Sequence, residues 1–559
     1  MRIEGNTHGL RTQPLRRLEK LANRRTPADS IISPEFARAL TETSRELERQ
    51  VGVLIDRRGE TRKLIVGDAK ALFLPDLREY RQSRDRLCGL RLVHTHLNGE
   101  PLTDDDLTDL AVLRLDLIAA VGTLEDGLPG AVHVAHLLPN NDAGQPWELL
   151  KYRTVHELPS DFPEMIGALE EEFARLRKPR AVGDTRERGI LVHVSQDRLV
   201  DAEDSILELK DLARAAGIDC VHEIIQRREI DPKYVMGKGK LQTAVIKAMQ
   251  LGAEALVFDQ NLTPAQVNAL SEFTDLKILD RTQVILDIFA QRAQTREGKI
   301  QVELAQLRYM LPRLGSKQTA LAYSRLTGGI GGRGPGETKL EIDRRRAQER
   351  AAMLEREVTK LGERRKLRRN VRIEKRIPTV AIVGYTNAGK STLLNNLTKS
   401  SVTAEDMLFA TLNPVSRRLR FPEDREVIIT DTVGFIRKLP KELMAAFRTT
   451  LEELDDADLL LHVVDASTDG FEERKAAVES VLDELGLSQT SRLLVLNKAD
   501  LCNLDELTGL AQQTGGVPIS ALDRSSFDVL MHAIVVALWE RANVRQERTE
   551  TALANLLAD

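Results

Sequence analysis

The fold of this chain is decided by the stretch Gly384-Tyr385-Thr386-Asn387-Ala388-Gly389-Lys390-Ser391. It has the spacing of a phosphate-binding loop, which is a glycine, four residues and then Gly-Lys-Ser. An apolar run at 378–383 precedes it, and we expect that run to be a buried strand and a helix to begin at Lys390. Backbone N–H groups of such a loop converge on phosphate, helped by the positive end of the helix dipole. The stretch therefore predicts a nucleotide-binding α/β domain.

A second motif, Asp431-Thr432-Val433-Gly434, follows an apolar strand expected at 427–430. We expect Lys390 to neutralise the β- and γ-phosphates. The hydroxyl of Ser391 and the carboxylate of Asp431 would hold one Mg²⁺ ion, the latter through a water. The backbone N–H of Gly434 can reach the γ-phosphate.

Two further motifs predict that the base is guanine. Asn497-Lys498-Ala499-Asp500 follows a strand expected at 492–496, which places it at the carboxyl edge of a parallel sheet. Asp500 can accept hydrogen bonds from N1–H and the exocyclic amine of guanine, whereas adenine would leave this carboxylate unpaired. Ser520-Ala521-Leu522 would close over the base. The order of the four motifs argues against four unrelated surface turns.

The residues predicted to contact nucleotide are Gly384, Tyr385, Thr386, Asn387, Ala388, Gly389, Lys390, Ser391, Thr392, Asp431, Thr432, Val433, Gly434, Asn497, Lys498, Asp500, Ser520, Ala521 and Leu522.

The composition is that of a soluble globular protein. With 559 residues the chain is long enough for about four domains. It has 42% hydrophobic and 30% charged residues and a formal charge of −4. We find no apolar run of membrane-spanning length and no signal peptide, so we expect a cytoplasmic protein. The isolated residues Cys88, Cys220 and Cys502 indicate neither a disulfide framework nor a thiolate metal site.

Changes in composition divide the chain into parts. Residues 1–35 are polar and rich in arginine, which predicts a flexible leader. From residue 51, a hairpin and two further strands predict an α/β module, closed by a helix at 161–177 and a linker at 178–185. From residue 189, strands alternate with helices, which predicts a parallel sheet. The expected parts are a leader (1–35), an N-terminal α/β module (36–180), an α/β subdomain (186–280), a helical hairpin (281–370), the nucleotide domain (377–543) and a polar tail (544–559).

Helical periodicity at 282–311 and 340–368 predicts two helices that pack as an antiparallel hairpin. The segment between them, at 315–339, contains Gly328-Gly-Ile-Gly-Gly-Arg-Gly-Pro-Gly336 and is too rich in glycine to bury a core. Its basic residues suit close approach to folded RNA; they are Lys317, Arg325, Arg333 and Lys339. A disordered connector is the alternative, and the sequence leaves both open.

The chain resembles the HflX family of translational GTPases over roughly 188–540. The likeness is carried by Gly-Gly-Arg-Gly-Pro-Gly-Glu-Thr at 331–338, by the phosphate loop, by Leu-Phe-Ala-Thr-Leu-Asn-Pro at 408–414 and by Asp-Thr-Val-Gly-Phe-Ile at 431–436. The resemblance implies binding to the large ribosomal subunit and its rRNA, with the hairpin directed at the peptidyl-transferase region. It also implies GTP-dependent splitting of stalled or idle ribosomes, by an enzyme that hydrolyses GTP to GDP and phosphate. A regulatory module that binds a non-ribosomal RNA or a protein is the alternative.

The fold class we expect is α/β: a P-loop GTPase domain preceded by an α/β subdomain, a long antiparallel helical hairpin with a glycine-rich tip and an additional N-terminal α/β module. The residues expected to be catalytic are Lys390, Thr411 and Gly434. The resemblance makes Thr411 the switch threonine that ligates Mg²⁺ together with Ser391 and Asp431. It also assigns Asn387 to a K⁺ ion.

Other expectations concern hydrolysis and the ends of the chain. Phe435 stands where many GTPases place a glutamine that orients the attacking water, so hydrolysis should be slow without help from another group. After one more helix at 527–540, we expect no C-terminal domain of the kind found in some family members. The protein is expected to be a monomer.

Two weaker patterns lie before the nucleotide domain. His94-Thr-His96, followed by Thr103, Asp105 and Asp106, faintly resembles the metal site of JAMM-type metallopeptidases, with Glu48 as a conceivable base. The spacing to the acidic ligand is one residue short, so we favour an inert role. Met236-Gly-Lys-Gly-Lys240 lacks a complete phosphate-loop pattern and is interpreted as a turn at a helix start.

Overall fold

The computed structural model describes residues 3–7, 10, 12–74, 80, 87–139, 146–177, 186–313, 339–374, 377–398, 415–421, 425–431, 434–435, 454, 457–468 and 470–540, without the side chains of 339–340, 363–374, 415 and 540. The chain forms two compact units. One consists of Met1–Ile206 with Ile218–Ile278, and the other of Leu207–Gly217 with Leu279–Asp559. In the described part of the chain, no helix combines the length and the apolar character needed to cross a bilayer.

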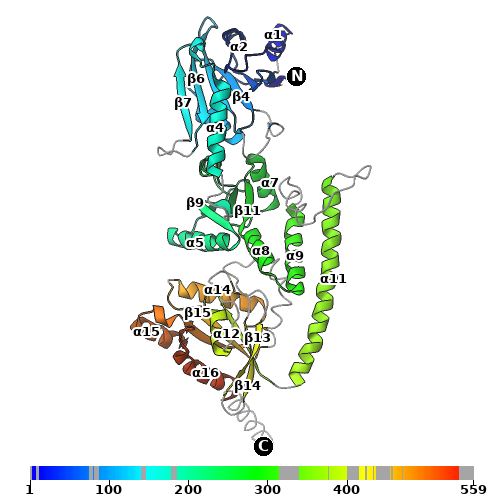
Figure 1. The fold of residues 1–559 in the computed structure, drawn as a ribbon, viewed down its shortest axis with the longest axis vertical. Helices are drawn as coiled ribbons and strands as arrows, with labels where there is room; N and C mark the ends of the chain where they lie inside the picture. Colours follow the sequence, from blue (N-terminus) through cyan, green and yellow to red (C-terminus); the bar gives the residue numbers. More distant parts are fainter. Residues whose placement is uncertain are drawn as a thin grey trace, which may run out of the picture. The chain divides into compact units, whose positions relative to one another are not determined.

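The first unit begins with a seven-stranded mixed sheet in the order β1-β3-β2-β4-β5-β6-β7 (Figure 1). Its strands are β1 (Ile3–Gly5), β2 (Val51–Asp56), β3 (Thr61–Val66), β4 (Leu90–His96), β5 (Leu117–Thr123), β6 (Pro129–Leu137) and β7 (Trp147–Tyr152). The helices are α1 (Thr12–Ala22), α2 (Pro34–Leu47), α3 (Asp104–Leu113) and α4 (Phe162–Arg177), with the short turn η2 (Val155–Glu157). One core, in which Phe36, Val93 and Phe162 are buried, joins helices to sheet. The expected hairpin is confirmed as the antiparallel pair β2 and β3.

The expected flexible leader is wrong for the described residues. Strand β1 pairs in parallel with β3, and α1 buries Leu18 and Leu21 in the core. The reason is that α1 is amphipathic: its leucines lie on one face and its arginines and lysine on the other. The prediction was based on the overall polarity of the segment and therefore missed that pattern.

The second sheet has four strands in the order β11-β10-β8-β9, and its central pairs are parallel, as expected. Its elements are β8 (Glu187–Ser195), α5 (Leu199–Ala215), β9 (Ile218–Arg227), α6 (Lys238–Leu251), β10 (Ala255–Phe258), α7 (Pro264–Phe273) and β11 (Lys277–Asp280). Residues of α6 and α7, including Leu241 and Leu270, pack with β8 and β10 in one core.

In its described residues, the helical region contains three helices where the sequence predicted two. The first expected helix is split into α8 (Arg281–Arg292) and α9 (Arg296–Met310), because Thr295 caps a new helix by accepting a hydrogen bond from Gly298. A short turn, η3 (Leu311–Arg313), follows α9, and α11 (Lys339–Glu374) is the second long helix. α9 and α11 lie side by side with a shared core that includes Leu304, Ala347 and Leu354 (Figure 1). The glycine-rich tip lies outside the described residues.

The nucleotide domain has six strands in the order β13-β14-β12-β15-β16-β17. Its strands are β12 (Thr379–Gly384), β13 (Val415–Arg420), β14 (Glu426–Asp431), β15 (Leu459–Asp465), β16 (Ser491–Asn497) and β17 (Val517–Pro518). Its helices are α12 (Lys390–Thr398), α14 (Phe471–Glu484), α15 (Leu504–Thr514) and α16 (Phe527–Val535), with the short turns η4 (Ala499–Leu501), η5 (Arg524–Ser526) and η6 (Val536–Glu540).

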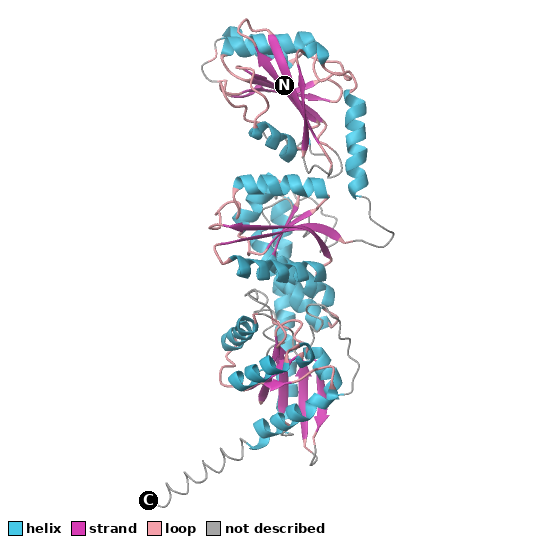
Figure 2. Cartoon of the chain, turned by 90° about the vertical axis from the view of Figure 1, so that its left-hand side faces the viewer, coloured by secondary structure: helices cyan, strands magenta, loops and turns pink. Residues whose placement is uncertain are grey.

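Helices cover both faces of this sheet (Figure 2). Val463 and Val495 pack with α12 and α16, whereas the next residues, Val464 and Leu496, pack with α14 and α15. Alternate residues of a strand point to opposite faces, so strands covered on both sides are apolar throughout. This arrangement brings the carboxyl ends of β12, β14, β15 and β16 to one edge, where the site lies.

Candidate nucleotide-binding site

The phosphate loop leaves β12 and enters α12 at Lys390, as the sequence predicted. Three of its residues have positive φ, Gly384 at 157°, Asn387 at 62° and Gly389 at 87°. A side chain at Gly389 would place its Cβ 2.2 Å from Nδ2 of Asn497, so both the backbone conformation and the neighbouring amide require glycine here. The loop thus turns sharply, with its backbone closely apposed to the base-recognition motif.

Lys390 and Asp431 are buried together beneath the loop. The Lys390 ammonium donates a hydrogen bond to the carbonyl oxygen of Tyr385 at 2.7 Å, which holds the side chain along the loop. Burial lowers the pKa of Lys390 to about 8, against the opposing influence of the Asp431 carboxylate. Bound phosphates would add compensating negative charge beside this cation.

Ser391 and Asp431, the two described residues predicted to hold Mg²⁺, are in direct contact. The Ser391 hydroxyl donates to Oδ2 of Asp431 at 2.7 Å, which brings two oxygen ligands from different elements together. Hard oxygen donors beside a phosphate loop are what Mg²⁺ requires, so these residues fit the ion. The third predicted ligand, Thr411, lies outside the described residues.

Gly434 and Phe435 lie directly against the phosphate loop. Phe435 donates its N–H to Gly384 O at 3.0 Å and accepts from Thr386 N at 2.8 Å. A Cβ on Gly434 would lie 2.9 Å from Cγ2 of Thr386 and 3.0 Å from Nζ of Lys390. The Phe435 side chain is only 2% exposed, so this residue contributes a backbone bridge and a buried ring.

Asn497 joins the base-recognition motif to the two other loops. Its Nδ2 donates to Ala388 O at 2.7 Å, and its Oδ1 accepts from Ala521 N at 2.8 Å. Sequence reasoning placed Asn497 in the site without predicting this bridge. It missed Asn396 altogether, whose Nδ2 donates to Ala521 O at 2.7 Å from helix α12.

Asp500, Lys498 and Leu522 surround the expected position of the base. Asp500 is exposed in the short turn η4, and Leu522 is 76% exposed. Lys498 has a φ of 63° and its ammonium lies 2.7 Å from Oδ2 of Asp465. Asp465 was not predicted, although its place at the end of β15 on the same sheet edge was a usable signal.

Several predicted residues cannot be placed. Thr432 and Val433 lie outside the described residues, as do Lys317, Arg325 and Arg333 of the glycine-rich segment. Lys339 begins helix α11, and its side chain is not described.

The weaker patterns have different outcomes. Met236 is buried, and Gly237 is the N-cap of α6, which agrees with a turn at a helix start. In the N-terminal module, the structure brings His94, His96 and Asp106 together. Glu48 is exposed as the left-handed cap that ends α2, and Asp105 is exposed in the first turn of α3.

A hydrogen-bonded trio absent from the sequence prediction lies in the second sheet. His193 on β8 contacts Asp259 through Nδ1 at 2.8 Å and Ser195 through Nε2 at 3.0 Å. His193 and Asp259 are buried. The i, i+2 spacing of His193 and Ser195 on one strand was the available signal.

Three family profiles match consecutive parts of the chain. They are "GTP-binding GTPase N-terminal" at 203–290, "GTP-binding GTPase Middle Region" at 292–372 and "50S ribosome-binding GTPase" at 379–498. The last match contains the phosphate loop, Asp431 and Asn497, which meet in the structure.

Curated relatives are similar over most of their own length. A protein named GTPase HflX from Caldanaerobacter subterraneus is 44% identical over 380 residues, 68% of this chain and 85% of that protein. GTPase HflX from Lacrimispora saccharolytica is 46% identical over 356 residues, 64% of this chain and 84% of that protein. GTPase HflX from Escherichia coli is 42% identical over 368 residues, 63% of this chain and 86% of that protein.

Proposed function

Because the chain belongs to the HflX family of GTPases, we propose that it binds the large ribosomal subunit in its GTP state and separates stalled or idle ribosomes into subunits. Hydrolysis then times its release. The observation that carries the proposal is the meeting of Lys390, Ser391 and Asp431 at one edge of the sheet, within a domain that matches ribosome-binding GTPases.

The contacts of Gly434 and Phe435 support a switch that depends on the γ-phosphate. Phe435 donates one backbone hydrogen bond to the phosphate loop and accepts another from it, so a movement of that loop would move Phe435 with it. A third phosphate bound beside Lys390 would draw the N–H of Gly434 toward it, and loss of that phosphate would release it. GTP and GDP would thereby favour different arrangements of the switch segments and different affinities for the ribosome.

The residues of this chain make most of the contacts to GTP but contribute little to activation of the attacking water. Lys390 places positive charge on the phosphates, and Asp500 selects guanine. Ser391, Asp431 and Thr411 would hold Mg²⁺, which would supply further positive charge near the γ-phosphate. The buried phenyl ring of Phe435 cannot hydrogen-bond water, so we propose that basal hydrolysis is slow and that the large subunit accelerates it.

Asn387 is the proposed contact for a K⁺ ion. Its positive φ directs an exposed side chain away from the buried part of the loop. A monovalent cation there would add positive charge close to the phosphates. Turnover of GTP should then be faster in K⁺ than in Na⁺, and equal rates in the two salts would remove this role.

Sedimentation of ribosomes with the full chain tests the proposal. Cosedimentation with the large subunit is expected with GTP or a non-hydrolysable analogue and is expected to be lost with GDP. Intact ribosomes should fall apart into subunits under the first two conditions. Absence of binding in all nucleotide states would instead favour the alternative, a regulatory module acting on another RNA or on a protein.

The glycine-rich segment offers a second test of the ribosomal role. Residues 328–336 can be replaced by a Gly-Ser linker of equal length, which preserves the connection between the helices. We expect basal GTP hydrolysis to be unchanged and subunit separation to be lost. Separation at the original rate would show that this segment is not needed.

A further inference from the structure

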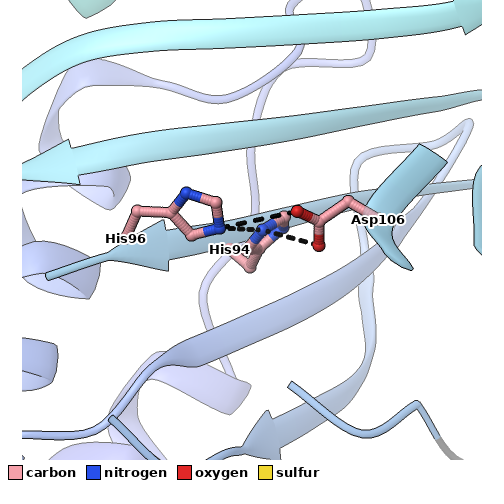
Figure 3. Close-up of side chains that lie close together, drawn as sticks. All are labelled: His94, His96 and Asp106. Carbon is pink, nitrogen blue, oxygen red and sulfur yellow. Dashed lines mark hydrogen bonds and ion pairs between the residues drawn. The ribbon is translucent and has the colours of Figure 1, made fainter. Parts of the chain in front are cut away.

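The N-terminal module contains three potential metal ligands that converge from two elements (Figure 3). His94 and His96 are i, i+2 neighbours on β4, so their side chains leave the same face of the sheet. Asp106 reaches the same point from the first turn of α3. The described parts of the nucleotide domain contribute nothing to this cluster, so it is separate from the GTP site.

The separations of the ligand atoms fit one small cation. Nε2 of His94 and Nε2 of His96 are 3.0 Å apart. Nε2 of His94 is 3.3 Å from Oδ1 of Asp106, and Nε2 of His96 is 3.6 Å from Oδ2. Zinc bonds of about 2.0–2.1 Å in a tetrahedron give ligand separations of about 3.3 Å. The two imidazole nitrogens are close to this separation, each lies near a different Asp106 oxygen, and one ligand atom from each residue lies within 4.8 Å of the others.

Each of two ligands is oriented by a partner outside the cluster. Nδ1 of His96 lies 2.8 Å from the carbonyl oxygen of Glu100, which requires the proton on Nδ1 and leaves the Nε2 lone pair facing the cluster. Oδ2 of Asp106 accepts from the N–H and hydroxyl of Thr103, at 2.8 and 2.7 Å. A carbonyl that fixes an imidazole and a hydroxyl that fixes a carboxylate are typical outer partners of metal ligands.

Hydrogen bonds within the protein do not satisfy every ring nitrogen of this cluster. His94 is fully buried, and its Nδ1 has no partner among the described residues. If the proton of His94 is on Nδ1, two imidazole lone pairs face each other at 3.0 Å. If it is on Nε2, the lone pair of Nδ1 is buried and unpaired, which is unfavourable. A cation between the two Nε2 atoms removes the repulsion in the first case.

Small residues on the neighbouring strands leave room around the imidazoles. Gly52 of β2 is paired with His94, and Gly122 of β5 is paired with His96. A Cβ on Gly52 would lie 3.3 Å from the Cβ of His94 and 2.4 Å from a methyl carbon of Leu72. Asp106 is 16% exposed, so its side of the cluster is the route by which an ion could enter.

We propose that His94, His96 and Asp106 bind a divalent transition-metal ion of the zinc class, with a fourth coordination position open to water or an external ligand. Two neutral imidazoles and one carboxylate suit Zn²⁺, whereas Mg²⁺ prefers an all-oxygen shell. Three protein ligands are characteristic of exchangeable or catalytic zinc sites, and four are usual in purely structural ones. This proposal departs from the sequence-based preference for an inert role.

Metal content of the untagged full-length protein tests the proposal. The protein is stripped with a chelator, incubated with Zn²⁺ alone, separated from free ion and assayed by mass spectrometry. We expect one zinc per chain in the wild type and in His156→Ala, an exposed histidine in the same module. In His96→Gln and Asp106→Asn, affinity should fall by more than about 100-fold, because even the loss of an orienting partner costs 10- to 100-fold.

Further readouts separate loss of a ligand from loss of the fold. Asp106→Asn keeps an oxygen that can accept from Thr103, so helix α3 retains its cap. Circular dichroism and basal GTP hydrolysis should match the wild type in both variants. Co²⁺ should give the visible absorption of a tetrahedral site in the wild type only. Equal zinc uptake by the wild type and both variants, or no uptake by the wild type, would overturn the proposal.

Discussion

Nδ2 of Asn497 donates a hydrogen bond to the carbonyl oxygen of Ala388 at 2.7 Å, so a residue that ends β16 holds the phosphate loop in place. The same side chain accepts from Ala521. One amide therefore joins the base-recognition motif, the phosphate loop and the loop at Ala521.

Asn497→Ala should weaken binding of every nucleotide that uses the phosphate loop. The change leaves Ala388 O and Ala521 N without their buried partner. We expect GDP affinity to fall by about 10- to 100-fold, since each buried group left unpaired costs about 1–3 kcal/mol. Titration with fluorescent GDP measures this, with Thr508→Ala, which removes an exposed hydrogen bond on α15, as the control. Wild-type affinity in Asn497→Ala would contradict the bridging role.

Asp500→Asn should change which base is bound. The carboxylate accepts two hydrogen bonds from guanine, whereas the amide offers an oxygen that can accept from N1–H and an NH2 group that can donate to the C2 carbonyl of xanthine. We expect GTP affinity to fall by about 100-fold or more and XTP affinity to rise, because a site with mispaired polar groups rejects its ligand strongly. Competition between GTP, XTP and ATP measures the change. Asp505→Asn, on α15, should leave the preference for GTP intact.

Gly434→Ala should separate hydrolysis from binding. Its methyl group would lie 2.9 Å from Thr386 and 3.0 Å from Lys390, so the segment must move away from the phosphate loop. We expect hydrolysis of GTP to fall by about 100-fold, as for loss of one donor to the transition state. GDP binding should stay close to that of the wild type. Gly509→Ala, where a Cβ meets no atom within 4 Å, is the control, and equal hydrolysis rates in both variants would refute the switch contact.

His462 should make the nucleotide domain less stable at acidic pH. Burial, with Arg492, Lys475 and Lys390 nearby, lowers the pKa of His462 to about 4, and its Nε2 has no partner among the described residues. The unfolded chain binds this proton near pH 6.5 and the folded chain only near pH 4, so stability is lost as the pH falls between these values. The loss amounts to about 3 kcal/mol.

His462→Leu should remove this dependence. Trp539 packs in the core of the nucleotide domain, so in a Trp147→Phe background its fluorescence reports urea unfolding of that domain. Midpoints at pH 7.5 and 4.5 should differ less in His462→Leu than in His532→Gln, which changes an exposed histidine on α16. The same pH dependence in both variants would exclude His462 as the cause.

The sequence was sufficient to predict the positions of residues that follow from the order of motifs along the chain. Lys390, Ser391 and Asp431 were placed correctly because a strand, a glycine turn and a helix leave little choice of geometry. The links made by Asn497 and Asn396 were not predictable, because motif spacing says which residue follows a strand and not which carbonyl its side chain reaches.

The N-terminal module shows a different limit. His94 and His96 were recognised as residues on one face of a strand, but the ligand set was judged by its spacing to Asp106. The structure brings Asp106, in the first turn of α3, beside both histidines, so spacing along the chain was a poor guide to spatial proximity. Similarly, the average polarity of residues 1–35 hid the apolar face of α1 that packs on the sheet.

Helix α11 has a mechanical consequence for the nucleotide domain. Its 36 residues form a rod of about 54 Å, and only four residues separate Glu374 from the first residue of β12, the strand that carries the phosphate loop. If nucleotide exchange tilts that rod by about 5° at its β12 end, the opposite end moves by about 5 Å, the pitch of one helical turn. A displacement too small to disturb the sheet would thus be amplified, as by a lever arm, at Lys339, where the glycine-rich segment ends.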